Sequence, residues 1–253
     1  MRVALLSDIH GNSLALDAAL ADIGSDIDEY WILGDLVALG PDPVGVLQRL
    51  SGLQNSHFIR GNTDRYVVTG DRPPPFAEDL GVEGLDREML RIFAEIAGTF
   101  AWTQGAVTAT GWLDWLSQLP LELYKTLPDG TTCLLVHASP GTDDGTGFDK
   151  DMSDAEIQRL LYGCSADVIW VGHTHQQIDR RVGTSRVLNP GSISNPRAPI
   201  LQAGYAILDA TAEGYKIEHR LVDYDWEQVI SQVQRLNHPG ADFIIKHLRG
   251  LRT

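Results

Sequence analysis

The chain has 253 residues, 43% of them hydrophobic, and is therefore long enough to bury a sizeable core in one large α/β domain or two small ones. Its 20 Lys and Arg residues oppose 34 Asp and Glu residues, which gives a net charge of −14. A surface of this sign repels nucleic acid and anionic lipid, so the composition disfavours a general nucleic-acid coat protein and a membrane-surface protein.

The first part of the sequence alternates between short apolar runs and helical segments. Apolar runs at 2–7, 29–33 and 57–60 predict strands, and each runs into a polar turn. The intervening segments 12–23 and 41–53 have the periodicity of helices. Repeated alternation of this kind predicts mainly parallel pairing, which gathers the carboxyl ends of the strands along one edge of a sheet, where such folds bind ligands.

The sequence changes character over about 65–119, where we expect a helical insertion. Consecutive prolines from Pro73 interrupt the chain, and residues 85–96 and 111–119 have helical periodicity. Three tryptophans lie in this region, at Trp102, Trp112 and Trp115. Because large aromatic side chains dominate protein cores, we interpret them as packing residues. A lid, a dimer contact and a cap all stay open as roles for the insertion.

Strand patterns dominate the rest of the chain. Residues 121–127 and 131–137 flank a Pro-Asp-Gly turn and predict a hairpin. Further predicted strands cover 167–171, 177–188, 205–208 and 215–222, and predicted helices cover 153–163, 226–236 and 241–248. No segment has the composition of a disordered linker, so we expect one domain over 1–253, with C-terminal helices at about 225–250.

The cysteines and the apolar runs bear on the compartment. Cys133 and Cys164 lie among apolar or small residues, and we expect buried free thiols, as in a reducing cytoplasm. The first apolar run meets Asp8 and His10 too soon for a signal peptide, and no run approaches the ~18 residues of a membrane span. We therefore expect a cytoplasmic protein.

Metal-ligand residue types follow five of the predicted strands: Asp8, His10, Asp35, Asn62, His137, His173 and His175. Several lie beside glycine, which lets the backbone pass close to a crowded centre. Imidazole nitrogens and carboxylate oxygens suit first-row divalent ions, and one carboxylate can bridge two of them. Because alternate residues of a strand point in opposite directions, Asp8 and His10 reach one centre only if the chain leaves strand geometry there.

Such a set fits the two-metal route to phosphate-ester hydrolysis. Two cations about 3.5–4 Å apart neutralise phosphoryl oxygens and hold a hydroxide between them. The ions also lower the pKa of water from about 15.7 toward neutrality. Each motif alone is ordinary in loops, but the ordered set together indicates a site.

Five segments carry a resemblance to a known family: Ser7-Asp8-Ile9-His10-Gly11-Asn12, Gly34-Asp35, Gly61-Asn62-Thr63-Asp64, His137-Ala138 and Gly172-His173-Thr174-His175. They resemble the ordered motifs of the calcineurin-like metallophosphoesterase superfamily. Residues 189–192, Asn-Pro-Gly-Ser, resemble a segment common in its small bacterial and archaeal phosphodiesterase branch. The resemblance covers 1 to about 209 and leaves the insertion and the C-terminal helices outside.

The resemblance implies an α/β fold, a four-layer α/β/β/α sandwich of two mixed sheets, with a dinuclear metal site. It places Asp8, His10 and His175 on one metal, and Asn62, His137 and His173 on the other, with Asp35 bridging both. A water or hydroxide shared by the metals is then the nucleophile. The donor set accepts Mn, Fe, Zn, Co or Ni, so the identity of the two divalent ions stays open.

One motif departs from the family pattern. Many members have a histidine, held to protonate the leaving group, where this chain has Thr63. A threonine hydroxyl cannot act as a general acid near neutral pH. Either another group supplies the proton or the preferred substrate has a good leaving group. For the next residue, Asp64, we hypothesise that it holds a metal ligand in place, since ligating imidazoles commonly donate their second N–H to a carboxylate.

Three residues are candidates for substrate contacts. Arg60 and Arg197 lie near motifs and are able to grip phosphate oxygens in bidentate fashion, although surface salt bridges account for them equally well. Asn12 is a candidate phosphate contact, but the N-cap of the first helix is the better-supported interpretation. The histidines without a motif are interpreted as structural or exposed: His57, His219, His238 and His247.

The sequence thus favours a metal-dependent phosphoesterase, and the branch that it resembles favours a phosphodiesterase. One alternative is a phosphomonoesterase acting on nucleotides or phosphoproteins. Another is a non-catalytic metal-binding scaffold, like the retromer subunit that shares this fold; the seven competent ligand positions argue against it. The expected partner is a phosphate-ester substrate, and a nuclease is disfavoured by the acidic charge. Nothing in the sequence predicts an oligomeric state.

Overall fold

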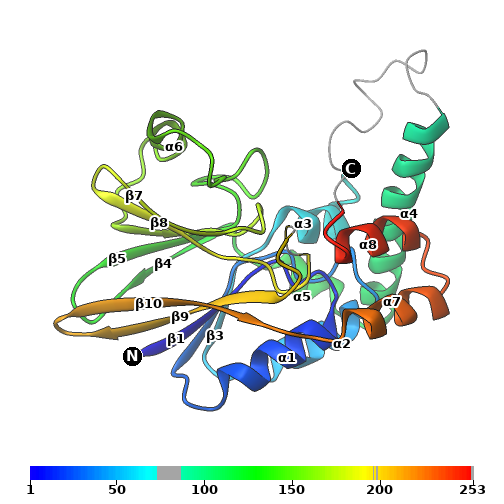
Figure 1. The fold of residues 1–253 in the computed structure, drawn as a ribbon, viewed down its shortest axis with the longest axis horizontal. Helices are drawn as coiled ribbons and strands as arrows, with labels where there is room; N and C mark the ends of the chain where they lie inside the picture. The colour runs from blue at the N-terminus through cyan, green and yellow to red at the C-terminus, as the bar shows by residue number, and fades with distance from the viewer. Residues whose placement is uncertain (73–86, 196, 198, 252–253) are drawn as a thin grey trace.

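The computed structural model describes residues 1–72, 87–195, 197 and 199–251, and it contains two five-stranded sheets (Figure 1). The first sheet has the order β10-β9-β1-β2-β3, with bounds β1 Arg2–Leu6, β2 Glu29–Ile32, β3 Ser56–Phe58, β9 Ala203–Thr211 and β10 Gly214–Val222. The second has the order β4-β5-β6-β8-β7, with bounds β4 Glu122–Thr126, β5 Thr132–Val136, β6 Val168–Trp170, β7 Gln177–Val182 and β8 Ser185–Pro190.

The two sheets are stacked, and helices cover their outer faces. On β1, Leu6 faces a core shared with the helices α1 (Ser13–Ile23) and α2 (Pro43–Ser51), whereas Leu5 faces a core between the sheets. On β5, Leu135 joins the same inter-sheet core, and Val136 packs toward α6 (Asp154–Leu160) on the other side. Figure 1 shows the resulting order of helices, sheet, sheet and helix, which confirms the expected fold class.

Pairing in both sheets is mixed. β1, β2 and β3 are parallel to one another, as are β5, β6 and β8. The parallel pairing expected for the first three strands is confirmed, as is the predicted hairpin β4–β5. β7–β8 and β9–β10 are also antiparallel, because their turns are too short for a parallel crossover. The parallel strands are the ones that carry the metal-ligand residues, so those residues gather at the strands' carboxyl ends.

The helical region between β3 and β4 begins before the expected 65, and its long helix continues past the predicted end at 96, whereas the last helix is shorter than the predicted 111–119. The helices are α3 (Asn62–Thr69), α4 (Arg87–Ala109) and α5 (Leu113–Ser117). Helix α3 starts inside the Gly-Asn motif because the Asp64 carboxylate accepts the Gly61 backbone N–H and caps the first turn. The prolines from Pro73 and the predicted helix start at residue 85 lie outside the described residues.

These helices pack on the first sheet. Phe100 of α4 and Leu116 of α5 are buried in the same core as Leu6. The ring of Trp115 meets Phe58 of β3 edge-on, with centroids 5.2 Å apart. Trp112 and Trp115 therefore pack against the core, as interpreted from the sequence.

Two C-terminal helices, α7 (Trp226–Arg235) and α8 (Ala241–Leu248), pack on each other through a small apolar core that includes Val233 and Ile244. Between them, the His238 ring meets Trp102 of α4, with centroids 4.5 Å apart. Figure 1 shows α8 beside α4 at one end of the molecule. His238 is thus a structural residue that ties the C-terminal helices to α4.

Both cysteines are free, but they differ in burial. Cys133 is buried, and burial raises the pKa of its thiol to about 12. Cys164 is only half-buried, so the expectation of two buried thiols is wrong for this residue, which follows the short helix α6 near the surface. Among the described helices, none is both long and apolar enough to cross a membrane.

Candidate metal centre

The predicted ligands converge where the carboxyl ends of the two sheets meet. Asp8, His10, Asp35 and His175 place one ligand atom each within 4.8 Å of one another. The His175 Nε2 atom lies 3.2 Å from Asp8 Oδ1 and 3.2 Å from His10 Nε2. These four residues follow β1, β2 and β6, so both sheets contribute to one cluster.

The remaining predicted ligands lie on the other side of Asp35. Its Oδ2 atom is 3.4 Å from His137 Nε2 and 3.7 Å from His10 Nε2, so the carboxylate stands between the two groups. His173 Nδ1 lies 3.1 Å from Asn62 Oδ1. The structure therefore brings Asn62, His137 and His173 to the opposite side of Asp35 from the first cluster.

The backbone at these residues is left-handed, which explains how neighbouring ligands face one centre. Five ligands have positive φ: Asp8 at 54°, His10 at 48°, Asp35 at 55°, His173 at 66° and His175 at 60°. Non-glycine residues adopt this region rarely, and such strain concentrates at functional sites. The chain has therefore left strand geometry at the motifs, as the alternation of strand side chains demands.

Two glycines allow the backbone to approach the ligands closely. A Cβ atom at Gly61 would lie 2.1 Å from Asp35 Oδ1. A Cβ atom at Gly172 would lie 2.0 Å from Ser7 Oγ and 2.9 Å from Asp8 Oδ2. Any side chain at either position would displace a ligand.

Backbone carbonyl groups fix the tautomers of the four imidazoles. The facing pairs are His10 Nδ1 with Ala38 O at 3.1 Å, His137 Nδ1 with Leu33 O at 2.6 Å, His175 Nδ1 with Asn195 O at 2.6 Å, and His173 Nε2 with Gly145 O at 2.8 Å. A carbonyl oxygen only accepts, so each of these nitrogens carries the proton. In the neutral form of each ring, the other nitrogen carries a lone pair directed at the centre, as metal ligation requires.

The electrostatics of the centre suit cations. Burial by itself would raise the pKa of Asp35, but the positive charges of the surrounding histidines, that of His137 first, outweigh it and hold that pKa well below its usual range. Burial likewise opposes the effect of His175, which lowers the pKa of Asp8 to about 2. His137 Nε2 is buried without a hydrogen-bond partner among the described residues. Two ionised carboxylates beside an unpartnered imidazole nitrogen fit divalent metal ions.

Comparison with known proteins identifies the family. The model of the calcineurin-like phosphoesterase superfamily domain matches residues 1–213. The chain belongs to this superfamily. The phosphoesterase family supports a hydrolase of phosphate esters, and four of the seven predicted ligands lie within 4.8 Å of one another.

Individual relatives extend the likeness over the whole chain. An uncharacterised protein of Methanocaldococcus jannaschii is 28% identical over 253 residues, which is 94% of this chain and 93% of that protein. The structure of a hypothetical protein from Pyrococcus horikoshii has a TM-score of 0.82 at 25% identity and covers 100% of this chain and 99% of its own. A metallophosphoesterase from Sphaerobacter thermophilus has a TM-score of 0.77 at 22% identity, with the same coverage.

The likeness therefore includes the helices at 65–119 and at the C-terminus, which the motif resemblance leaves out. A shorter stretch of 71 residues is 37% identical to part of the symmetrical bis(5′-nucleosyl)-tetraphosphatase of Pectobacterium atrosepticum. It covers 27% of this chain and 25% of that relative.

The two residues that follow Asn62 in the phosphoesterase motif form hydrogen bonds to Asp35 or to the backbone around it. Asp64 accepts hydrogen bonds from the N–H groups of Leu36 at 2.8 Å and Gly61 at 2.9 Å. That Asp64 holds a metal ligand in place stays a prediction; its described hydrogen bonds run to backbone amides around Asp35 and not to an imidazole. Burial, followed by the charge of Asp35, raises the pKa of Asp64 to about 7. The Thr63 N–H donates to Asp35 Oδ1 at 2.9 Å.

The candidate substrate contacts have structural partners. Arg60 Nε lies 2.7 Å from Asp143 Oδ2, and Arg197 Nη1 lies 2.8 Å from Asp149 Oδ2. The Asn12 side chain accepts the Ala15 N–H at 3.1 Å, which makes it the N-cap of α1. Only Arg197 of these three also lines a cavity beside His175.

One functional segment, residues 143–145, has no signal in the sequence. Arg60 and Arg65 bind Asp143, and Arg65 also binds Asp144 at 3.0 Å. These ion pairs hold the segment against α3, and its Gly145 carbonyl accepts from His173. An Asp-Asp-Gly turn is too common in loops to be recognised, so only the structure connects it to the centre.

Proposed function

We propose that this chain is a phosphodiesterase that depends on two divalent metal ions. Asp8, His10 and His175 would hold one ion, Asn62, His137 and His173 would hold the other, and Asp35 would contact both. The observation that carries the proposal is the set of four imidazoles whose outer nitrogens donate to backbone carbonyls, so that in the neutral rings the inward nitrogens are lone-pair donors beside Asp8 and Asp35. When bound, such ions neutralise charge on phosphoryl oxygens and acidify water.

The charge around the centre favours a diester over a monoester. A diester carries one negative charge, whereas a monoester approaches two at neutral pH because its second pKa is about 6. Arg60 and Arg197, the guanidinium groups near the motifs, are both paired with carboxylates. In a protein of net charge −14, the singly charged ester meets less repulsion.

Thr63 restricts the leaving group. Its hydroxyl is buried, without a hydrogen-bond partner among the described residues, and it does not ionise near neutral pH. No proton reaches the leaving oxygen from this position. Substrates whose leaving group is a weak base, such as an aryl oxide, are therefore expected to react fastest.

The test compares bis(p-nitrophenyl) phosphate with p-nitrophenyl phosphate, using chelated protein with and without added Mn²⁺. We expect diester turnover that appears with Mn²⁺, exceeds monoester turnover, and falls in Asp35→Ala to the level of the chelated protein. Asp26→Ala, which removes a 95% exposed carboxylate, is the matched control and should retain the wild-type rate. Metal-independent turnover, or undiminished turnover in Asp35→Ala, would contradict the proposal, and faster monoester turnover would contradict the diester preference.

A further inference from the structure

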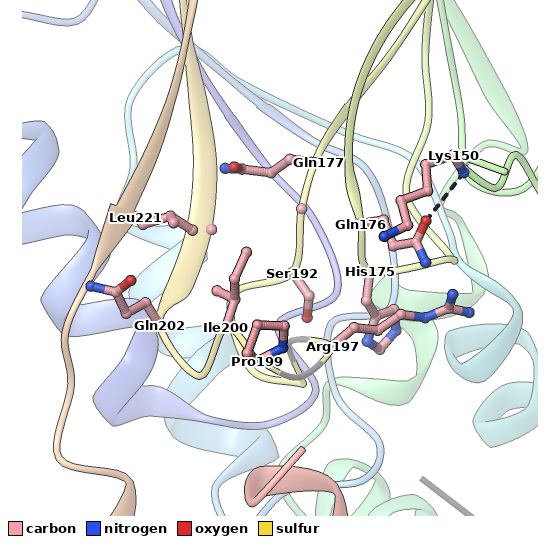
Figure 2. Close-up of a pocket in the computed structure, with 12 residues that line it drawn as sticks. Lys150, His175, Gln176, Gln177, Ser192, Arg197, Pro199, Ile200, Gln202 and Leu221 are labelled. Carbon is pink, nitrogen blue, oxygen red and sulfur yellow. Dashed lines mark hydrogen bonds between the residues drawn. The ribbon is translucent and has the colours of Figure 1, made fainter. Parts of the chain in front are cut away.

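A cavity of about 350 Å³ opens directly beside the metal-centre residue His175 (Figure 2). Its wall comes from the segment that follows β6 and from Leu221 of β10, with Lys150 at its edge. It also includes these residues between β8 and the start of β9: Gly191, Ser192, Arg197, Pro199, Ile200, Gln202 and Gly204. This volume lies in the range of small-molecule sites, which is about 300–1,000 Å³. The cavity therefore has room for an organic group attached to a phosphate at the centre.

The chemistry of the wall changes from one end of the cavity to the other. Figure 2 shows Arg197 next to His175, and Lys150 on the same side. The opposite side carries Ile200, Leu221 and Gln202. A ligand that matches this wall has an anionic group at one end and a flat, partly apolar group at the other.

The apolar end is exposed to solvent. Ile200 is 41% exposed and Leu221 is 39% exposed, and both belong to the small set of large hydrophobic side chains that the described surface leaves uncovered. Contact with a ligand would remove this apolar area from water, which stabilises a complex. Two such side chains on one cavity wall point to an organic group that covers them.

Amide groups on the wall are oriented by their neighbours. Gln202 Nε2 donates to Asp223 Oδ1 at 3.0 Å, which leaves the amide oxygen as an acceptor. Gln176 Oε1 accepts from the backbone N–H of Lys150 at 3.2 Å, which leaves the Gln176 amide nitrogen as a donor (Figure 2). The Gln202 acceptor lies at the apolar end, where it suits a donor on the edge of a nucleobase, and the Gln176 donor lies on the side of Lys150 and Arg197, where it suits an anionic group.

We propose that this cavity binds the nucleoside of a nucleotide ester whose scissile phosphate lies at the metal centre. The base lies at the end formed by Ile200, Leu221 and Gln202, and the phosphate lies toward Arg197 and His175. This inference rests on the proposed phosphodiesterase function and adds its substrate class.

The kinetic test uses two diesters that share one leaving group. They are p-nitrophenyl thymidine 5′-phosphate and methyl p-nitrophenyl phosphate, of which only the first carries a nucleoside. We expect kcat/KM to be at least about tenfold higher for the nucleoside ester, mainly through KM. Ile200→Asp should reduce this ratio to about one. Because Ile200 is exposed, the substitution leaves the core intact, and Leu90→Asp, at a 49% exposed position on α4, should keep the wild-type ratio.

A binding measurement separates this inference from the proposed function. Thymidine 5′-monophosphate is titrated into the Mn²⁺-loaded full chain and into its Ile200→Asp variant by calorimetry. Turnover of both esters at equal kcat/KM would overturn the nucleoside inference and leave the phosphodiesterase proposal standing. Nucleotide binding that Ile200→Asp abolishes, without turnover of either ester, would support the cavity and overturn the enzymatic proposal. Absence of both turnover and binding would overturn both.

Discussion

At the scale of single residues, the carboxylate of Asp35 is positioned by backbone groups. The Thr63 N–H binds one of its oxygens, and the residue that follows it, Leu36, is held by Asp64. Gly61 packs so closely that no Cβ atom fits there. The Gly-Asn-Thr-Asp segment thus supplies one ligand and also fixes the place of another.

This arrangement gives Asp64 a measurable role. Asp64→Ala leaves two buried N–H groups without acceptors, and we expect the free energy of unfolding to fall by about 3 kcal/mol. Mn²⁺ affinity should fall by about 10–100-fold, since the segment around Asp35 loses its support. Urea unfolding and metal titration measure the two effects. The control is Asp26→Ala, and equal stability of the two variants would refute the role.

The ligand residues were predictable from sequence because their chemistry lies in their side chains. The acceptors that set the imidazole tautomers were not, because Leu33, Ala38, Gly145 and Asn195 act through backbone carbonyls. A carbonyl group is present at every residue, so its role depends on the fold alone. Arg60 pairs with the side chain of Asp143, which lies 83 positions along the chain, so only the packing of residues 143–145 on α3 reveals this partner.

At the scale of elements, the predicted strands and helices are mostly present, and the errors occur where tertiary contacts decide. Helix α3 starts at Asn62 because Asp64 caps it, although a Gly-Asn pair alone indicates a turn. Helix α4 continues through Gly98 and Gly105, two residues of low helix propensity. Buried side chains along α4, such as Phe100 and Val107, hold it on the first sheet and outweigh that propensity.

The junction of α4 with the C-terminal helices predicts a pH dependence of stability. His238 Nδ1 accepts the Gly240 N–H at 3.1 Å, and burial lowers the pKa of the ring to about 4. Below pH 6.5, the usual pKa of histidine, the ring therefore binds a proton in the unfolded chain but stays neutral in the native state. Stability should fall as the pH drops from 6.5 to 4, by up to about 3 kcal/mol from this residue.

His238→Asn isolates this contribution, because the Asn oxygen replaces Nδ1 as an acceptor and does not titrate. Thermal unfolding at pH 7.5, 6 and 4.5 is compared with the wild type. We expect the variant to lose less stability over this interval. Parallel losses in the two proteins would show that His238 is not responsible.

At the scale of the whole molecule, the centre joins the two sheets. His10 and Asp35 extend from the first sheet, and His137 and His175 extend from the second. Divalent ions that bind residues of both sheets at once would bind only the assembled fold, so we expect them to stabilise the folded state by mass action.

Thermal unfolding should respond accordingly. Free Mn²⁺ at 100 times its Kd stabilises the fold by about 2.7 kcal/mol, which raises the Tm by about 5–10 °C for a protein of this size. Differential scanning calorimetry of chelated and Mn²⁺-loaded protein measures the shift. Asp35→Ala should show a smaller one. A Tm that does not depend on metal would contradict a centre shared between the sheets.

The position of β1 in the first sheet, between β2 and β9, has a consequence during synthesis. β9 begins at Ala203, so the ribosome has made all seven predicted ligands before β1 gains its second neighbour. Until then one edge of β1 offers free N–H and C=O groups to any other chain. A nascent chain released before Ala203 thus carries every residue of the centre and still lacks the strand that closes its sheet, and its expected fate is aggregation.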